Sequence, residues 1–332
     1  MTTTIFRNYS CALQVIQVLF RREVTVLLAC AIIAVTVSFF SPYFLTFDNF
    51  GAILRNCYEL FLISLGMTLL MAMAGIDISV GALLGLCAIL VGKLVLVPGI
   101  PIFLVFISGP LLGIFLGFLI SIPVVYGKVP AIIATLGFLG IFKTSIYAIL
   151  GGKWLSGLPK DLTELVYLPV LGFPLILIII LMVFLFTAFL LERTPYGIQL
   201  RAVGNSLHNA KLSGLAVNKI QIITFLLSGA FCGLAGTLFV ATYRNVEMST
   251  GNNLALEAIA AVIIGGTKLT GGNYSLIGTI LGVFLIKLIQ NGLLFLGIAS
   301  LWQIVVTGVI IIIILVLEKL TSQFWGKVSN AV

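Results

Sequence analysis

The sequence predicts an all-α polytopic membrane protein with about ten transmembrane helices. Apolar residues make up 61% of its 332 residues and charged residues only 8%. A soluble fold of this length would lack polar side chains for its surface. The apolar residues form runs of about 20 residues, the length that spans a bilayer, between short breaks rich in Gly, Pro or charge. The basic residues gather in three segments, which predicts how the chain is oriented.

The distribution of charge places both termini and one central segment in the cytoplasm. The three segments hold nine basic and three acidic residues, so they carry +6 of the net charge of +8. Cytoplasmic loops collect Lys and Arg, so an even number of spans must lie on each side of the central segment. This pattern fits a protein whose partners include membrane lipid and exclude nucleic acid. We expect an N-terminal segment over 1–23, a transmembrane domain over 24–317 containing the cytoplasmic loop 192–219, and a C-terminal tail over 318–332. The basic residues concerned are Arg7, Arg21, Arg22, Arg193, Arg201, Lys211, Lys219, Lys319 and Lys327.

Six spans are expected before the central segment. The Phe47–Arg55 patch is too short and too polar to cross, and Lys153–Tyr167 is expected to be a polar loop. Pro and Gly clusters mark several ends, such as Ser41-Pro42 and Pro98–Pro101. The spans are Val24–Phe40, Cys57–Gly75, Val80–Val97, Ile102–Tyr126, a fifth that starts at Lys128–Pro130 and ends near Gly151, and Val170–Leu191.

Four spans are expected after the central segment. Leu256–Ile264 is short, and it either spans or forms a re-entrant segment before Gly265-Gly266. The other three are Ile220–Tyr243, Leu276–Phe295 and Leu301–Leu317.

The signatures of common enzymes are absent from the sequence. There is no phosphate-binding loop or nucleophile elbow, and the single histidine, His208, excludes a two-histidine zinc motif. The five cysteines have no metal-ligand spacing, so we predict no metal site and no catalytic residue. An intramembrane acid pair would need two acids, whereas Asp77 is the only one expected deep within the first five spans.

Charged residues within the spans are candidates for a translocation pathway or gate. Each costs roughly 2.5 to 3.5 kcal/mol at the bilayer centre, so it is expected to have a purpose. The candidates are Asp77, Lys143 and Lys287. Asp77 could instead cap the next helix together with Ser79, and the two lysines could be structural. Asn273 could bind a polar solute or join two helices.

Glycines four residues apart predict close helix packing. Such small residues let helix backbones approach each other in lipid. Two breaks, Gly75–Gly81 and Gly272–Gly278, are also similar, since each places polar residues directly before a helix with glycines four residues apart. Such similarity between two halves is typical of transporters built from internal repeats. The spaced glycines are Gly81/Gly85, Gly109/Gly113/Gly117, Gly229/Gly233 and Gly278/Gly282.

The central segment carries a group of residues that repeats a known pattern: Gly197, Arg201, Gly204, Asn205, Ala210, Lys211, Leu212, Ser213 and Gly214. Further matches are Gly75–Gly81, Lys128–Gly137, which includes Thr135, and Ala258–Gly266. With these residues the segment resembles the cytoplasmic loop of permease subunits in bacterial ABC importers for monosaccharides, the ribose, xylose and autoinducer-2 group. The resemblance implies that the loop couples the permease to an ATP-hydrolysing partner.

The resemblance also implies an architecture and a set of partners. It implies a non-catalytic, type II importer-like permease of the bacterial inner membrane, without a cofactor of its own because the partner ATPase binds ATP–Mg. The other partners are a second homologous permease subunit and a periplasmic solute-binding protein. Asp77, Ser79, Thr135, Lys143, Asn273 and Lys287 are then the pathway or gating candidates.

The solute is indicated by one loop. Gly151–Pro159 resembles the autoinducer-2 branch of the group, while ribose or another monosaccharide is the alternative. Lys287 and the lack of a long basic tail depart from that branch. An ion-coupled secondary transporter is the alternative from a different class.

Overall fold

The computed structural model describes residues 22–299 and seven further helical positions: 302, 305, 308, 309, 312, 313 and 316. The expected tenth span, Leu301–Leu317, lies outside the described residues except at those positions. The C-terminal tail 318–332 and nearly all of the N-terminal segment 1–23 also lie outside them.

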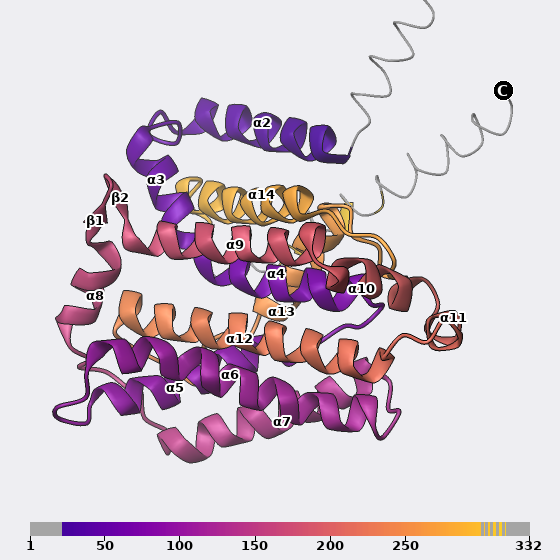
Figure 1. Ribbon diagram of the computed structural model, residues 1–332. Coiled ribbons are helices and arrows are strands. Elements are labelled where there is room, and N and C mark those ends of the chain that lie inside the picture. The colour runs from indigo at the N-terminus through magenta and orange to yellow at the C-terminus, as the bar shows by residue number, and fades with distance from the viewer. Residues whose placement is uncertain are drawn as a thin grey trace, which may run out of the picture.

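The described chain is a bundle of helices that run side by side (Figure 1). α10 and α11 project at one end, here called the α10 end, while α8, β1 and β2 lie at the opposite end, the α8 end. The elements are α2 (Arg22–Phe40), α3 (Phe47–Asn56), α4 (Tyr58–Ala72), α5 (Val80–Val95), α6 (Ile102–Val125), α7 (Ala131–Leu150), α8 (Lys160–Tyr167), β1 (Pro169–Val170), β2 (Phe173–Pro174), α9 (Leu175–Arg193), α10 (Pro195–Asn205), α11 (Leu207–Leu212), α12 (Val217–Tyr243), α13 (Leu254–Ile264) and α14 (Leu276–Phe295).

The helices confirm the polytopic membrane architecture. Within the described residues, six helices are long and apolar enough to cross a membrane: α2, α6, α7, α9, α12 and α14. The pair α3 and α4, bent by 47°, forms a seventh candidate, and α5 and α13 are shorter apolar helices. The short eighth segment of the sequence prediction is therefore helical, and the total of ten spans stays a prediction.

Two expected boundaries at the α8 end are wrong. The expected polar loop Lys153–Tyr167 contains α8, whose buried Leu162 and Val166 lie four residues apart on one helix face. The first residues of the expected sixth span form the β1–β2 hairpin instead, so α9 begins only at Leu175. The hairpin turns at Leu171 and Gly172, which both have positive φ, as a two-residue turn requires.

α4 and α12 form the centre of the bundle. All 15 residues of α4 are buried, which explains why this helix is apolar on every side. α12 packs along α6, where the spaced glycines bring the two backbones together: a Cβ at Gly113 would overlap the Gly229 carbonyl, and one at Gly233 would overlap the Gly109 carbonyl. The predicted role of these glycines in close helix packing is confirmed.

Gly113→Val is expected to destabilise the bundle, because the added side chain must push α6 away from α12. Overpacking of this kind costs about 1–3 kcal/mol. Thermal unfolding of the purified protein should therefore begin at a lower temperature. Gly140→Val in α7 is the matched control, since a Cβ there meets no atom within 4 Å. Equal unfolding temperatures for the two variants would contradict the packing argument.

Candidate functional site

The central polar segment folds into two short helices because its local signals start and stop each one. Pro195 occupies the first turn of α10, where its missing N–H is not needed. Ser206 caps α11 by accepting a hydrogen bond from the Asn209 amide at 3.2 Å. Gly214, with φ of +80°, then turns the chain towards α12. The loop is therefore a structured helical unit.

The predicted coupling residues divide into buried and exposed sets. Three are buried, namely Gly197, Gly204 and Ala210. The other six are exposed: Arg201, Asn205, Lys211, Leu212, Ser213 and Gly214. Ile198 and Leu212 are 74% and 75% exposed. Apolar side chains held this far out on short polar helices are suited to entering a groove of a soluble partner.

Gly204 brings α10 against two breaks in the bundle at once. A Cβ at Gly204 would overlap the carbonyl oxygen of Ala72, the last residue of α4. It would also meet the amide nitrogen of Gly272 at 2.5 Å. The two breaks are joined to each other by a hydrogen bond from the Gly272 amide to the Ala72 carbonyl at 2.9 Å. Only glycine allows α10 to touch both.

A second contact fixes α10 to the same break. Arg201 Nη2 donates to the Tyr274 hydroxyl at 2.8 Å, and its guanidinium lies 4.4 Å from the ring centroid. The Tyr274 hydroxyl in turn donates to the Leu191 carbonyl of α9 at 3.1 Å. Arg201 therefore holds α10, α9 and the chain ahead of α14 together.

Tyr196 ties the beginning of α10 to α12. Its hydroxyl lies 2.8 Å from the Thr224 Oγ1. Burial raises the pKa of Tyr196 to about 12, and the hydrogen bond to Thr224 opposes that rise only in part. A phenol is neutral at physiological pH already at its ordinary pKa, and the raised pKa keeps Tyr196 protonated, and so able to donate to Thr224, at more alkaline pH as well.

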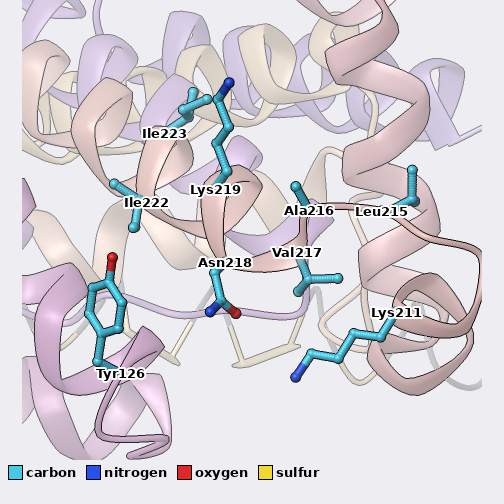
Figure 2. A pocket seen from close by; sticks show the side chains of 9 residues that line it. All are labelled: Tyr126, Lys211, Leu215, Ala216, Val217, Asn218, Lys219, Ile222 and Ile223. Carbon is cyan, nitrogen blue, oxygen red and sulfur yellow. The ribbon is translucent and has the colours of Figure 1, made fainter.

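A hollow of about 600 Å³ lies beside α11, where α12 begins (Figure 2). Tyr126 from the end of α6 closes one side of it, and Lys211 and Asn218 extend from the other elements. Lys219 points to the opposite side of α12 from Lys211 in this view. The hollow continues the exposed surface of α11 onto the bundle.

Asp77 and Ser79 lie in the break between α4 and α5, and Thr135 of α7 packs against it. One carboxylate oxygen of Asp77 accepts hydrogen bonds from the Ser79 amide at 2.7 Å and the Ser79 hydroxyl at 2.6 Å. The Thr135 hydroxyl accepts from the Ile78 amide at 3.2 Å. All three side chains are buried. Asp77 thus fixes the chain directly before α5, but within the described residues no side chain caps the amides of α5 itself, so the predicted capping is not seen.

The two short helices α5 and α13 begin next to each other. A Cβ at Gly81 would overlap the Gly251 carbonyl, and one at Gly85 would meet the Thr250 carbonyl at 2.8 Å. Gly81 and Gly85 therefore pack against the chain that enters α13. Interrupted helices with adjoining N-termini in the interior are typical of transporter pathways.

The remaining pathway candidates lie apart from Asp77. Asn273 is exposed and follows Gly272 at the α10 end. Lys143 is half-buried in α7 and has no ion pair among the described residues. Lys287 lies in α14, where its Nζ is 3.9 Å from Oε2 of Glu257 in the first turn of α13. The structure thus brings together three of the six candidates and separates the others.

The expectation that Asp77 is the only deep acid of the first five spans is wrong. Glu59, in the first turn of α4, is only 8% exposed. Its carboxyl is attracted by Lys287 and lies near the hydroxyls of Tyr58 and Tyr243. Glu59 lies close to the start of the expected span Cys57–Gly75, and residues there are usually assigned to the membrane–water interface. Because α3 precedes α4 and forms one candidate span with it, Glu59 lies within the helical pair and not at its end.

Comparison with known proteins identifies similar sequences. Residues 49–315 match the family model described as "Branched-chain amino acid transport system / permease component". The chain is 34% identical over 297 residues to the autoinducer 2 import system permease protein LsrC of Escherichia coli (strain K12 / DH10B), covering 90% of this chain and 86% of that protein. LsrC of Yersinia pseudotuberculosis serotype O:1b is 34% identical over 303 residues, with 90% and 84% covered. No solved structure matches the chain.

Gly204→Ala is expected to separate α10 from the two breaks, because the methyl group overlaps the Ala72 carbonyl. The Gly272 amide would then lose its protection, and its hydrogen exchange should become about tenfold faster or more, which corresponds to about 1.4 kcal/mol of local stability. Exchange measured by mass spectrometry over 265–275 tests this. Gly137→Ala, where a Cβ meets no atom within 4 Å, is the control. Unchanged exchange in Gly204→Ala would refute the contact's role.

Proposed function

The chain belongs to the family of permease components of branched-chain amino acid transport systems, and on that premise we propose that it is the subunit that imports autoinducer-2. As an ABC permease it is a non-catalytic transmembrane subunit of the bacterial inner membrane, and the family implies an ATPase and a solute-binding protein as partners. The observation that carries the mechanism is the position of α10, which has exposed coupling residues on one side and Gly204 against the bundle on the other.

ATP-driven motion enters the permease through α10 and α11. The partner ATPase binds ATP–Mg and docks on Ile198 and Leu212, which lie on the exposed side of these helices. When the ATPase changes shape, α10 moves, and Gly204 transmits the motion to the ends of α4 and α14. Close-packed backbones pass on such a displacement without absorbing it.

The proposed topology has ten spans with both termini and the α10 end in the cytoplasm. The basic residues Arg201 and Lys211 at that end support it, since cytoplasmic loops are enriched in such residues. α8 and the β1–β2 hairpin are then periplasmic and available to the solute-binding protein. A second homologous permease completes the type II importer arrangement.

The adjoining starts of α5 and α13 are the proposed gating region. Asp77, Ser79 and Thr135 hold the chain ahead of α5, so motion at Ala72 reaches them along only a few residues. Lys143 remains a pathway candidate on α7. Asn273 follows Gly272 at the α10 end, so it is better placed to move with α10 than to contact the solute.

Autoinducer-2 is favoured as the solute by the LsrC relatives, which match over 90% of this chain. Ribose or another monosaccharide is the alternative, because at 34% identity the residues that contact the solute can differ between the two proteins.

Leu212→Glu is expected to weaken binding of the ATP-binding subunit about tenfold or more, since it buries a charge in place of an apolar anchor. Co-purification and titration of the subunit onto nanodisc-embedded permease measure the effect. Trp154→Glu, an equally drastic change of an exposed side chain at the α8 end, is the control and should bind normally. Normal binding by Leu212→Glu would remove α11 from the docking surface.

Uptake identifies the solute. Cells lacking this subunit should lose ATP-dependent accumulation of labelled autoinducer-2 and retain that of ribose, and the intact gene should restore the loss. Loss of ribose uptake alone would overturn the autoinducer-2 assignment in favour of a sugar. Uptake that survives a mutated partner ATPase but stops when the ion gradient is collapsed would instead indicate an ion-coupled transporter.

A further inference from the structure

A partly buried charge cluster lies apart from the coupling surface and borders the gating region at the start of α13. It consists of Glu59 from α4, Glu257 from α13 and Lys287 from α14. Glu257 and Lys287 are each 16% exposed, with 3.9 Å between Oε2 and Nζ. Lys287 also attracts the Glu59 carboxyl, while Glu257 repels it. One ammonium is therefore paired with one carboxyl group and lies within electrostatic reach of a second, which comes from a different helix.

The cluster is incompletely satisfied in this conformation. Oε2 of Glu257, which lies 3.9 Å from Lys287 Nζ, accepts no hydrogen bond among the described residues. The hydroxyl of the fully buried Tyr58 lies near Thr242 and the Glu59 carboxyl, but its geometry makes a hydrogen bond to neither. Buried polar atoms are rarely left unpaired, so these groups point to a second arrangement in which they find partners.

Each carboxylate has an alternative to Lys287. The Glu59 carboxyl lies beside the hydroxyls of Tyr58 and Tyr243, which can donate to it. Glu257 lies in the first turn of α13, where the positive end of the helix dipole stabilises a negative charge. Either acid can thus remain stable without the Lys287 ammonium. The single ammonium, however, cannot pair closely with both acids at once.

α4 and the chain ahead of α14 meet α10 at the other end of these helices, and α13 packs on α14 there. Ala72 ends α4, Gly265 caps α13, and Gly272 precedes α14. Gly204 touches Ala72 and Gly272, and Gly265 packs on Gly278 of α14. A tilt imposed at those ends changes the distances between Glu59, Glu257 and Lys287.

We propose that Lys287 pairs with Glu257 in one conformation of the transporter and with Glu59 in the other, and that this exchange positions α13. The proposal rests on the proposed function, because ATP-driven motion of α10 supplies the tilt. Pairing with Glu257 holds the start of α13 on α14. Pairing with Glu59 ties α14 to α4 and frees α13. An intermediate position leaves the Lys287 ammonium without a close carboxylate, so two discrete positions result.

Spin-label distances in the assembled complex test the exchange. Labels are attached at Leu256→Cys on α13 and Leu294→Cys on α14, both exposed, after the native cysteines are replaced by alanine. Wild type should give two distance populations whose ratio changes when ATP hydrolysis is trapped with vanadate. Glu59→Gln should retain one population and Glu257→Gln the other. Uptake by either variant should fall about tenfold or more, since the cycle cannot reach one of its states.

The control and the outcomes separate this proposal from the proposed function. Lys93→Met removes a different lysine, which donates to the Ile149 carbonyl at 3.0 Å, and should behave as wild type. If wild type responds to ATP but the two Gln variants do not differ from each other, the ion pair is static and the exchange is refuted. If the Gln variants select opposite populations while ATP has no effect on wild type, the exchange stands and the ATP-driven function fails.

Discussion

The structure depends on one backbone contact, the approach of Gly204 to the end of α4 and to the chain ahead of α14. The exposed surface of α10 and the interior of the bundle lie on opposite sides of this single helix. No side chain separates Gly204 from the Ala72 carbonyl, so a displacement on one side has no flexible group to absorb it. Arg201, through Tyr274, adds a second fixed point one helical turn earlier. Two points on one helix transmit rotation as well as translation.

Breaks within a membrane protein are permitted only where protein surrounds them, because lipid cannot pair free backbone groups. The breaks here satisfy this condition. Between α4 and α5, Asp77 bonds to Ser79 and the Ile78 amide bonds to Thr135 of α7, while the end of α4 pairs with Gly272. The chain that enters α13 is held by a two-way bridge between Val246 and Leu155, at 2.9 and 3.0 Å. The fully buried α4 lies between these regions. The helices that α10 contacts are thus bordered by interruptions that protein encloses.

The sequence predicted the helices well where an apolar run was bounded by strong local signals. Leu276–Phe295 was placed at both ends, since Ser275 caps α14 and glycines precede it. α8 was missed because its eight residues are mostly polar and their apolar face appears only against the bundle. Glu59 was missed because α3 precedes α4 across a bend of 47°, so Glu59 does not lie at the end of the helical pair, which hydropathy does not reveal. The pair of Arg201 and Tyr274 joins residues 73 apart, a relation that no local pattern contains.

Some charged residues inside the bundle pair with neighbours in the sequence, and others pair with residues on other helices. The first kind of pair stays fixed when helices tilt, whereas the second kind can change. Asp77 bonds to Ser79, two residues away, so its geometry is set locally and survives a tilt of the surrounding helices. Glu59, Glu257 and Lys287 come from three helices, so their distances are set by how those helices lie. A local charge therefore stabilises a break in either conformation. A cluster assembled from separate helices can favour one conformation over the other, which is what a two-state transporter requires.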